Sequence, residues 1–544
     1  MKSFATAFSL LLLGIQLSAQ ITFSLDTLAK IEQVLNRYKS VNPGIQVSIS
    51  RNGILLFSSA NGMADLEHNV PLTTSSVIEA GSVSKQFTAA AVLLLEQQGK
   101  LSLEDDIRKV IPEIKDYGRP ILIRNMMQHT SGLKDWGSVV AISGWPRTTK
   151  TYSNDDALYI ITQQKTLNNQ PGNEFIYSNS NYNLLAILVQ RISGMSLADF
   201  SRENIFKPAG MLHTEWRADF RKIVPNRAIA YSKNGETYLA NMPNEYVYGN
   251  GGLITTTEDL LRWNDYYTGG QLGNPSLLQK QVTSSRFTNG LQHNYAAGIF
   301  LEKFNGLQLW THNGATAGYR SNLDYFPSLH LSIAWLSNTS EFDRSSFNLT
   351  DALREIFVGR KIAQDTNNPT VATTGFKPDL NKYTGWFKNT RNNTGLNLTV
   401  ENGAIVSSTS SQSLVPVAND GFMMGSNNIR FLPGYQRFYF ISPARDSIVF
   451  AKMQAPDLTP AKMQEYVGEY YSDEAVCKFI VRVKDNGLVL IQEPSREFKL
   501  SPTFKDGFEA PLGTILFERN NNKKVNQFSV SIARARNIQF DKTK

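Results

Sequence analysis

Hydrophobic and polar residues alternate with two different periods near the start of the chain. Between Leu28 and Tyr38, apolar residues recur at helical spacing, which predicts an amphipathic helix that ends before Asn42-Pro43. Two β-prone runs, 45–50 and 54–57, then flank Asn52-Gly53, a dipeptide that tolerates the positive φ angles of a tight turn. The pattern therefore predicts a helix followed by an antiparallel hairpin.

A second helix is predicted over residues 83–98, which are rich in helix formers and stop at Gly99. Gly81 and Ser82 stand at its entry, so Ser82 opens a largely buried helix. More helical segments follow, and short strands are predicted again at 294–301, 307–311 and 331–336. Strands at both ends of a helical middle indicate one sheet that is completed late in the chain.

The chain changes character after a stretch of linker composition at 364–376, and it then repeats itself once. In order, Tyr383-Thr384-Gly385, Leu414, Gly421-Phe422, Phe431, Phe438 and Phe450 recur as Tyr466-Val467-Gly468, Leu500, Gly507-Phe508, Phe517, Phe528 and Phe540. Short β-rich runs between turn residues predict that each copy, 377–455 and 456–544, is an antiparallel sheet or small barrel. Neither copy shows a nucleophile and base pair, which favours a scaffold, a lid or a recognition element.

Length and composition agree with several folded domains. A chain of 544 residues exceeds one ordinary core and corresponds to about two to four domains. Its residues are 41% hydrophobic, 11% aromatic and 19% charged, as in folded proteins and unlike disordered or fibrous ones.

The first residues have the order of a secretory signal. Lys2 precedes a short apolar run, 8–16, which is followed by the small residues Ser18 and Ala19. We interpret 1–19 as a signal peptide; a buried N-terminal helix is the alternative. The run is too short to span a membrane. The expected location is exported, periplasmic or secreted.

Charge, cysteine content and histidine spacing restrict the partners and cofactors that are expected. The net charge of +8 is spread without a basic run, so no nucleic-acid partner is expected. The single cysteine, Cys477, forms no internal disulfide. No close metal-ligand spacing and no Gly-rich phosphate loop occur, so the sequence predicts neither a metal nor a cofactor.

The segment Ser82-Val83-Ser84-Lys85 carries the first chemical signal. A spacing of three residues on a helix brings the hydroxyl and the amine onto one face. A serine needs a nearby base to attack a carbonyl carbon, and a lysine whose pKa is lowered by burial can serve. Free N–H groups at the helix start favour the negative charge that develops on the attacked carbonyl. Alone, the motif is weak, because two or three such pairs are expected by chance in a chain this long.

Four segments in order resemble the family of class C β-lactamases, penicillin-binding D,D-peptidases and related esterases. These are 79–87 (EAGSVSKQF), 126–133 (MMQHTSGL), 171–182 (PGNEFIYSNSNY) and 251–259 (GGLITTTED). The resemblance covers roughly residues 25–360. It implies an α/β (α+β) β-lactamase/transpeptidase-like domain over 20–363, in which an antiparallel sheet is flanked by a helical region. The all-β region of two similar repeats follows it.

The resemblance also implies roles for individual residues. Ser82 would be the nucleophile and Lys85 the first base. Tyr177 would pass protons between them and the leaving group, with Lys85 as the cation that lowers the pKa of the phenol. Asn179 would bond Lys85 or the substrate amide. Tyr152-Ser153-Asn154 has the same letters, but only Tyr177 follows Pro-Gly and precedes an amphipathic helical run.

A third segment, His312-Asn313-Gly314, follows a β-prone run where much of the family has Lys-Thr-Gly. The histidine puts β-lactam specialisation in doubt; a hydrogen-bonded structural histidine is the alternative role. The resemblance implies an oxyanion hole from the N–H groups of Ser82 and Ala315, with Gly314 letting the substrate approach. Arg320 could anchor a substrate carboxylate, or be a surface arginine.

These observations predict a serine hydrolase that acylates Ser82 and acts on D-amino-acid peptides, cell-wall fragments or small esters. Two alternatives remain: a dedicated β-lactamase, and a sensor or binding protein that holds a ligand without turnover. The expected partner is a small-molecule or peptide substrate, and no signal indicates the oligomeric state. No G-x-S-x-G elbow occurs, which disfavours an α/β-hydrolase.

Overall fold

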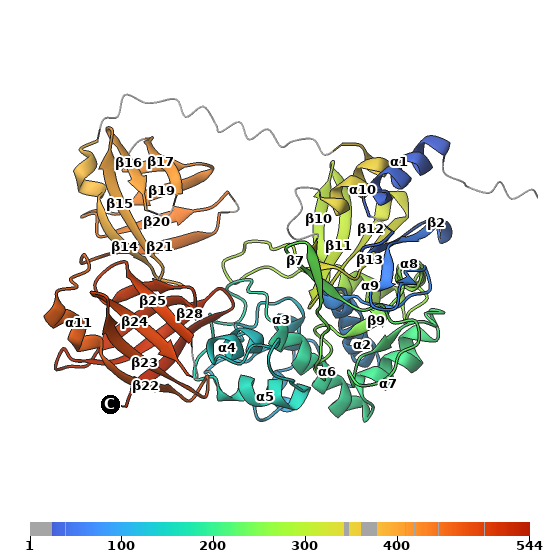
Figure 1. The fold of residues 1–544 in the computed structure, drawn as a ribbon, viewed down its shortest axis with the longest axis horizontal. Helices are drawn as coiled ribbons and strands as arrows, with labels where there is room; N and C mark the ends of the chain where they lie inside the picture. Colours follow the sequence, from blue (N-terminus) through green and yellow to red (C-terminus); the bar gives the residue numbers. More distant parts are fainter. Residues whose placement is uncertain are drawn as a thin grey trace, which may run out of the picture.

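The computed structural model describes residues 24–38, 40–341, 348–360, 378–408, 410–417, 420–443, 445–493 and 496–543. The expected signal (1–19) and linker (364–376) lie outside the described residues. Figure 1 shows a sheet-and-helix region and two β-barrels.

An antiparallel six-stranded sheet with the order β10-β11-β12-β13-β1-β2 organises the first region. Its strands are β1 Ile45–Arg51, β2 Ile54–Asn61, β10 Phe300–Phe304, β11 Leu307–Thr316, β12 Tyr319–Phe326 and β13 Leu331–Ser337. The late strand β13 pairs with the early strand β1, so the sheet is completed late, as the sequence predicts. Asn52 (φ 53°) and Gly53 (φ 74°) form the turn between β1 and β2.

Strand β1 is buried on both sides of the sheet, and its successive side chains contact different elements on the two faces. Ile45, Val47 and Ile49 join a hydrophobic cluster with α1 (Leu25–Leu35) and α10 (Leu349–Val358). On the other face, the Ser48 hydroxyl is 2.7 Å from that of Thr257 in α8 (Thr257–Thr268).

The structure differs from the sequence prediction at two strands of this sheet. Strand β10 begins at Phe300, not at 294, because 294–299 forms a loop closed by an isolated bridge. Strand β12 was not predicted at all. Its polar residues Ser321 and Asn322 hide the alternation, yet both are buried between neighbouring strands.

The helical region lies between the two halves of the sheet along the chain. Its main helices are α2 Lys85–Gln97, α3 Ile123–Met127, α4 Trp136–Ile142, α5 Asn154–Gln163, α6 Asn179–Ser193, α7 Leu197–Ser201 and α9 Pro275–Gln281. Short strands complete it: β3 Met63–Asp65, β4 Val70–Pro71, β5 Ile78–Glu79, β6 Glu215–Trp216, β7 Tyr231–Asn234, β8 Thr237–Ala240 and β9 Leu253–Thr255. Helices α2 and α6 pack together at the centre of the largest hydrophobic core.

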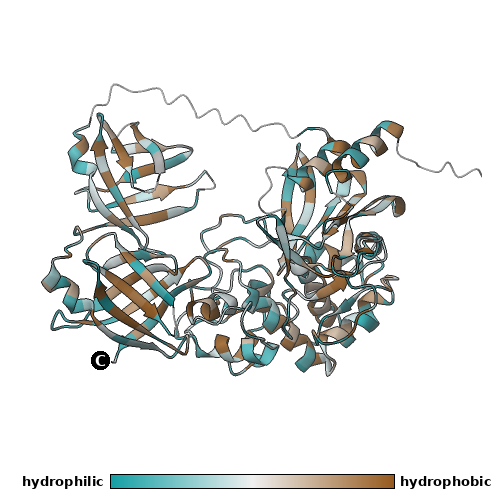
Figure 2. Ribbon diagram, viewed as in Figure 1, coloured by the Kyte–Doolittle hydropathy of each residue, from teal (hydrophilic) through white to brown (hydrophobic). Residues whose placement is uncertain are grey.

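The C-terminal region consists of two closed eight-stranded antiparallel barrels, which confirms the predicted pair of β-rich repeats. The first contains β14 Gly385–Asn389, β15 Gly395–Glu401, β16 Ala404–Ser407, β17 Ser410–Pro416, β18 Gly421–Met424, β19 Asn427–Phe431, β20 Arg437–Ile441 and β21 Ser447–Met453. Helix α11 (Pro460–Tyr466) leads to the second, with β22 Gly468–Ser472, β23 Cys477–Lys484, β24 Gly487–Gln492, β25 Arg496–Pro502, β26 Gly507–Ala510, β27 Gly513–Arg519, β28 Val525–Ile532 and β29 Ala535–Lys542. Hydrophobic residues alternate with hydrophilic ones along the barrel strands (Figure 2).

Equivalent residues of the two repeats play equivalent parts in the barrel cores. The Tyr383 hydroxyl donates to Asp420 Oδ1, and Tyr466 donates in the same way to Asp506 Oδ1. Phenylalanine rings stack with centroids 4.9 Å apart in the first barrel (438 and 450) and 4.8 Å apart in the second (528 and 540).

The second barrel packs against α4 of the helical region (Figure 1). Val139 and Ile142 of α4 belong to the same hydrophobic cluster as the interior of this barrel. The barrel and the helical region therefore share a core.

Among the described helices, none is by itself long and apolar enough to cross a membrane; one bent pair, Asn179–Ser193 with Leu197–Phe206, passes by length and composition.

Candidate active site

Ser82 lies in a single 3-10 turn, Gly81–Ser84, directly before α2, and is half-buried. Gly81 adopts φ 50°, and a Cβ at this position would come within 2.7 Å of the Ala315 backbone nitrogen. Only glycine allows this approach without strain. Strand β11 therefore passes directly beside the serine, with Ala315 exposed next to it.

Lys85 starts α2 one turn later and its side chain is fully buried. Its Nζ lies 3.1 Å from Ser82 Oγ, and it donates to Asn179 Oδ1 at 3.1 Å and to the Asn250 carbonyl. Burial lowers the pKa of Lys85 well below its usual value, although the nearby Asp135 opposes this effect. The amine is therefore suited to accept a proton from Ser82.

Tyr177 lies in the loop that leads into α6, with its ring centroid 4.9 Å from Lys85 Nζ. Its hydroxyl is buried and has no hydrogen-bond partner within the described residues. Burial raises the pKa of Tyr177 above its usual value, while the Ser82 side chain and the charge of Arg534 partly offset the rise. The phenol is thus neutral at physiological pH. No hydrogen bond joins the two hydroxyls in this geometry, but Ser82 is close enough to favour the phenolate.

These charges differ from the sequence-based expectation that Lys85 is the cation acting on Tyr177. Burial favours a neutral amine at Lys85, and the positive charge that acts on the phenol comes from Arg534.

Asn179 begins α6, and its backbone N–H donates to Asp135 Oδ2 at 2.7 Å. Its side-chain oxygen accepts the Lys85 bond described above. Behind it, His129 Nδ1 accepts the Ser178 N–H at 3.2 Å, and the His129 ring lies 4.2 Å from that of Tyr177. These contacts fix the entry of α6 against the loop that follows α3.

His312 and Gly314 lie on β11. The His312 ring is buried, Nε2 is 3.0 Å from the Tyr295 hydroxyl, and Nδ1 contacts the Asn313 carbonyl at 2.6 Å. Burial lowers the pKa of His312 to about 3, so the ring is neutral. At Gly314, a Cβ would lie 2.1 Å from the Ala80 carbonyl oxygen, which explains why this strand position has no side chain.

Arg320, on β12, donates through Nη1 to the carbonyls of Ala317 (2.9 Å) and Tyr319 (2.6 Å). To bind a substrate carboxylate, the Arg320 guanidinium would have to break or share these two bonds. The role of Arg320 as a carboxylate anchor stays a prediction.

The second Tyr-Ser-Asn triplet has structural contacts. The Tyr152 hydroxyl donates to the Trp145 carbonyl at 2.6 Å, and Ser153 caps α5. The structure thus places Tyr177, and not Tyr152, beside Lys85.

A cleft of about 450 Å³ opens beside Ala315. Its walls are the loops 147–151 and 241–245 and the end of β11 at 315–317. The sequence of neither loop indicates which substrate is bound. Both loops lie next to the expected oxyanion hole.

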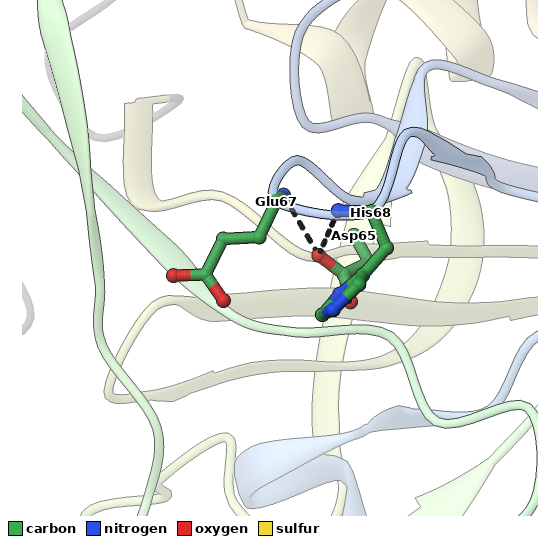
Figure 3. Close-up of side chains that lie close together, drawn as sticks. All are labelled: Asp65, Glu67 and His68. Atoms are coloured by element: carbon green, nitrogen blue, oxygen red, sulfur yellow. Dashed lines mark hydrogen bonds and ion pairs between the residues drawn. The ribbon is translucent and has the colours of Figure 1, made fainter.

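Within the described residues, one group of metal-ligand side chains comes together, formed by Asp65, Glu67 and His68 (Figure 3). One Asp65 oxygen accepts the backbone N–H groups of Glu67 (2.8 Å) and His68 (3.2 Å), and the other is 2.7 Å from His68 Nδ1. The carboxylate closes a surface turn. We therefore assign the cluster to local structure.

Three residues of the site were not predicted from the sequence. His129 lies within the 126–133 motif and could have been proposed from it. Asp135 follows that motif closely, but its bond to Asn179 depends on tertiary structure. Arg534 comes from the second barrel, and its guanidinium carbon lies 5.0 Å from the Tyr177 ring centroid. No local pattern indicates that contact.

Comparison with known proteins identifies the family of the chain. The family model described as Beta-lactamase matches residues 29–356. The chain is 27% identical to penicillin-binding protein 4* of Bacillus subtilis over 58% of this chain and 72% of that protein. It is also 27% identical to a D-aminopeptidase of Gluconobacter oxydans over 54% of this chain, and spans about half (56%) of that relative.

Solved structures show a similar fold. The octameric penicillin-binding protein homologue from Pyrococcus abyssi aligns with TM-score 0.54 and 19% identity over 87% of this chain and 99% of its own. A D-stereospecific amidohydrolase from Streptomyces aligns with TM-score 0.51 and 21% identity over 60% and 97%. Because the Beta-lactamase model matches residues 29–356, more than half of the chain, the protein belongs to the beta-lactamase family of serine hydrolases.

Proposed function

We propose that the protein forms an acyl-enzyme on Ser82 and hydrolyses amides, peptides or esters, with D-amino-acid peptides, cell-wall fragments or small esters as its substrates. One observation carries the proposal: a buried amine of lowered pKa, Lys85 Nζ, lies 3.1 Å from the half-buried Ser82 hydroxyl. A nucleophile and a base in hydrogen-bond contact are the arrangement that acyl transfer requires.

In the first half-reaction, Ser82 Oγ attacks the carbonyl carbon and its proton passes to Lys85 Nζ. The substrate oxygen becomes negative and accepts hydrogen bonds from the N–H groups of Ser82 and Ala315. The intermediate collapses as the bond to the leaving group breaks. The neutral Tyr177 hydroxyl donates a proton to that group and regains one from Lys85.

In the second half-reaction, water attacks the acyl carbon. A proton of this water passes to Lys85 as the new bond forms. The bond between the acyl carbon and Ser82 Oγ then breaks, and Lys85 returns the proton to Ser82 Oγ. Asn179 holds the amine throughout, through its 3.1 Å bond. The names of the relatives, D-aminopeptidase and penicillin-binding protein, support D-amino-acid amides and peptides as the first substrates to test.

The decisive experiment compares wild type with Ser82→Ala on β-lactams, D-Ala-D-Ala peptides, D-aminoacyl amides and p-nitrophenyl esters. We expect Ser82→Ala to lose all turnover with unchanged circular dichroism. Ser153→Ala, in the second triplet, is the matched control and should keep activity. Undiminished turnover by Ser82→Ala would refute the proposal. Rapid nitrocefin hydrolysis would indicate a dedicated β-lactamase, and a stable penicillin adduct without turnover would indicate a sensor.

We also propose that the protein is exported to the periplasm or secreted, with residues 1–19 removed. The order of charge, apolar run and small residues supports this. Mass spectrometry of the protein from its native host should find Gln20 at the N-terminus; an intact Met1 would contradict cleavage.

A further inference from the structure

The hairpin between β28 and β29 of the second barrel is held against the loops of the active site. The Arg534 carbonyl accepts the Asp135 N–H at 2.9 Å and the Asn168 side-chain amide at 3.0 Å. The Arg536 N–H in turn donates to Asn168 Oδ1 at 2.7 Å. Three hydrogen bonds, two at residue 534 and one at residue 536, therefore fix the hairpin backbone relative to Asp135 and Asn168.

A buried ion pair strengthens this docking. Lys134 Nζ lies 3.1 Å from Glu474 Oε1 of the second barrel, and both side chains are 0% exposed. With the shared hydrophobic core at Val139 and Ile142, the pair holds the hairpin in a constant position beside Asp135 and Asn168.

The Arg534 side chain extends from this fixed point over Tyr177, with the guanidinium carbon 5.0 Å from the ring centroid. The residue is exposed, and no carboxylate of the described residues lies within ion-pair distance of it. The neighbouring Arg536, by contrast, pairs with Glu174 at 3.1 Å. Arg534 thus presents at the catalytic tyrosine a positive charge without an ion-pair partner in the described part of the chain.

The other basic groups near Lys85 and Tyr177 are neutral or already bonded. Burial favours neutral Lys85 and His312, Arg147 pairs with Glu245, and Arg320 donates to the carbonyls of its own hairpin. The positive charge of Arg534 acts to lower the pKa values of Lys85, His129 and Tyr177. A guanidinium is a planar fork of donors that matches a carboxylate in two parallel bonds.

We infer that Arg534, supplied by the C-terminal barrel, is a specificity-determining residue that binds a carboxylate of the substrate beside Tyr177. The inference rests on the proposed hydrolase function and adds the charge of the substrate to it. The carboxylate belongs either to the leaving group or to the acyl group, and substrate pairs distinguish the two.

The test uses the full-length protein and two matched pairs of substrates. N-acetyl-D-alanyl-D-alanine and its C-terminal amide differ by a carboxylate on the leaving group. The p-nitroanilides of D-glutamate and D-glutamine differ by a carboxylate on the acyl group. In each pair, the quantity measured is the ratio of kcat/KM for the acid to kcat/KM for the neutral substrate.

We expect wild type to prefer the acid in one pair, and Arg534→Gln to lower that ratio by about 10- to 100-fold, the effect of losing a charge-assisted hydrogen bond. Arg534→Lys should keep part of the preference, and Arg534→Glu should reverse it. Arg536→Gln, on the same hairpin but already paired with Glu174, should leave the ratio as in wild type.

Damage to the fold lowers kcat/KM for both members of a pair and leaves the ratio unchanged. The ratio therefore distinguishes a loss of carboxylate recognition from a loss of folded protein. Equal ratios in wild type and Arg534→Gln for both pairs would overturn the inference. If wild type and Ser82→Ala are equally inactive on every substrate, the proposed function itself fails.

Discussion

The ion pair between Lys134 and Glu474 offers a quantitative test of how the second barrel is attached. Glu474 Oε1 accepts Lys134 Nζ at 3.1 Å and the Lys165 N–H at 2.7 Å, and Oε2 accepts the Gln539 N–H at 2.9 Å. Glu474→Gln keeps the size of the side chain but removes its charge and half of its acceptor capacity. The Lys134 ammonium is then buried without a counter-charge.

The expected cost is large because neither side chain is exposed to solvent. Burial already holds the pKa of Lys134 below its usual value, and the Glu474 charge opposes that shift. Removing one partner of a buried pair costs about 3–5 kcal/mol. At about 1.4 kcal/mol per factor of ten, the population in which the barrel is detached should rise by at least 100-fold.

Hydrogen exchange measures this population. The amides of Asp135, Lys165 and Gln539 donate across the interface or to Glu474, so in Glu474→Gln they should exchange at least 100-fold faster. The double variant Lys134→Met with Glu474→Gln should recover most of the protection, since no charge is left buried. A change below about 1 kcal/mol, the value of an exposed pair, would refute the reasoning.

Four further predictions concern the residues of the candidate active site. Tyr177→Phe should lower kcat by about 10²- to 10⁴-fold, yet raise the free energy of unfolding by roughly 1 kcal/mol, because it removes a buried hydroxyl without a partner. Tyr182→Phe is its control and should destabilise the protein in urea, since its hydroxyl donates to a carbonyl at 2.7 Å. The lowered pKa of Lys85 means that kcat/KM falls as acid protonates the amine, whereas a pH-rate profile without an acidic limb would contradict its role as base. Unfolding at neutral pH lets Lys85 take up a proton, so Lys85→Met should be more stable than wild type in urea, by a margin that shrinks as pH rises toward 10.5. Gly314→Ala should abolish activity and lower Tm, because its Cβ would lie 2.1 Å from a backbone oxygen; Gly487→Ala, with no atom closer than 3.7 Å, should do neither.

Local patterns predicted those parts of the molecule that depend on neighbours in sequence. The closeness of Ser82 and Lys85 follows from a spacing of three residues on a helix, and the turn at Asn52-Gly53 follows from the φ angles that these residues tolerate. The barrels followed from a repeat of aromatic and glycine positions. Strand β12 escaped because buried polar residues resemble exposed ones in a sequence.

Features that depend on burial or on distant contacts could not be predicted in the same way. His312 is a possible cation by residue type, but its neutral state results from the rings and strands around it. Glu474 and Arg534 lie in a domain whose sequence pattern left three roles open: scaffold, lid and recognition element. Their contacts join residues separated by more than 300 positions, and no periodicity records such pairs.

The attachment of the second barrel has a consequence for the order in which the molecule matures as it folds. Residues 82, 85, 177 and 315 all precede the second barrel in the chain, so the hydrolytic centre can assemble while Lys134 is still hydrated and lacks Glu474. Discrimination between charged and neutral substrates arrives only when the last barrel closes and brings its arginine to the tyrosine. A folding chain would thus gain reactivity first and selectivity afterwards.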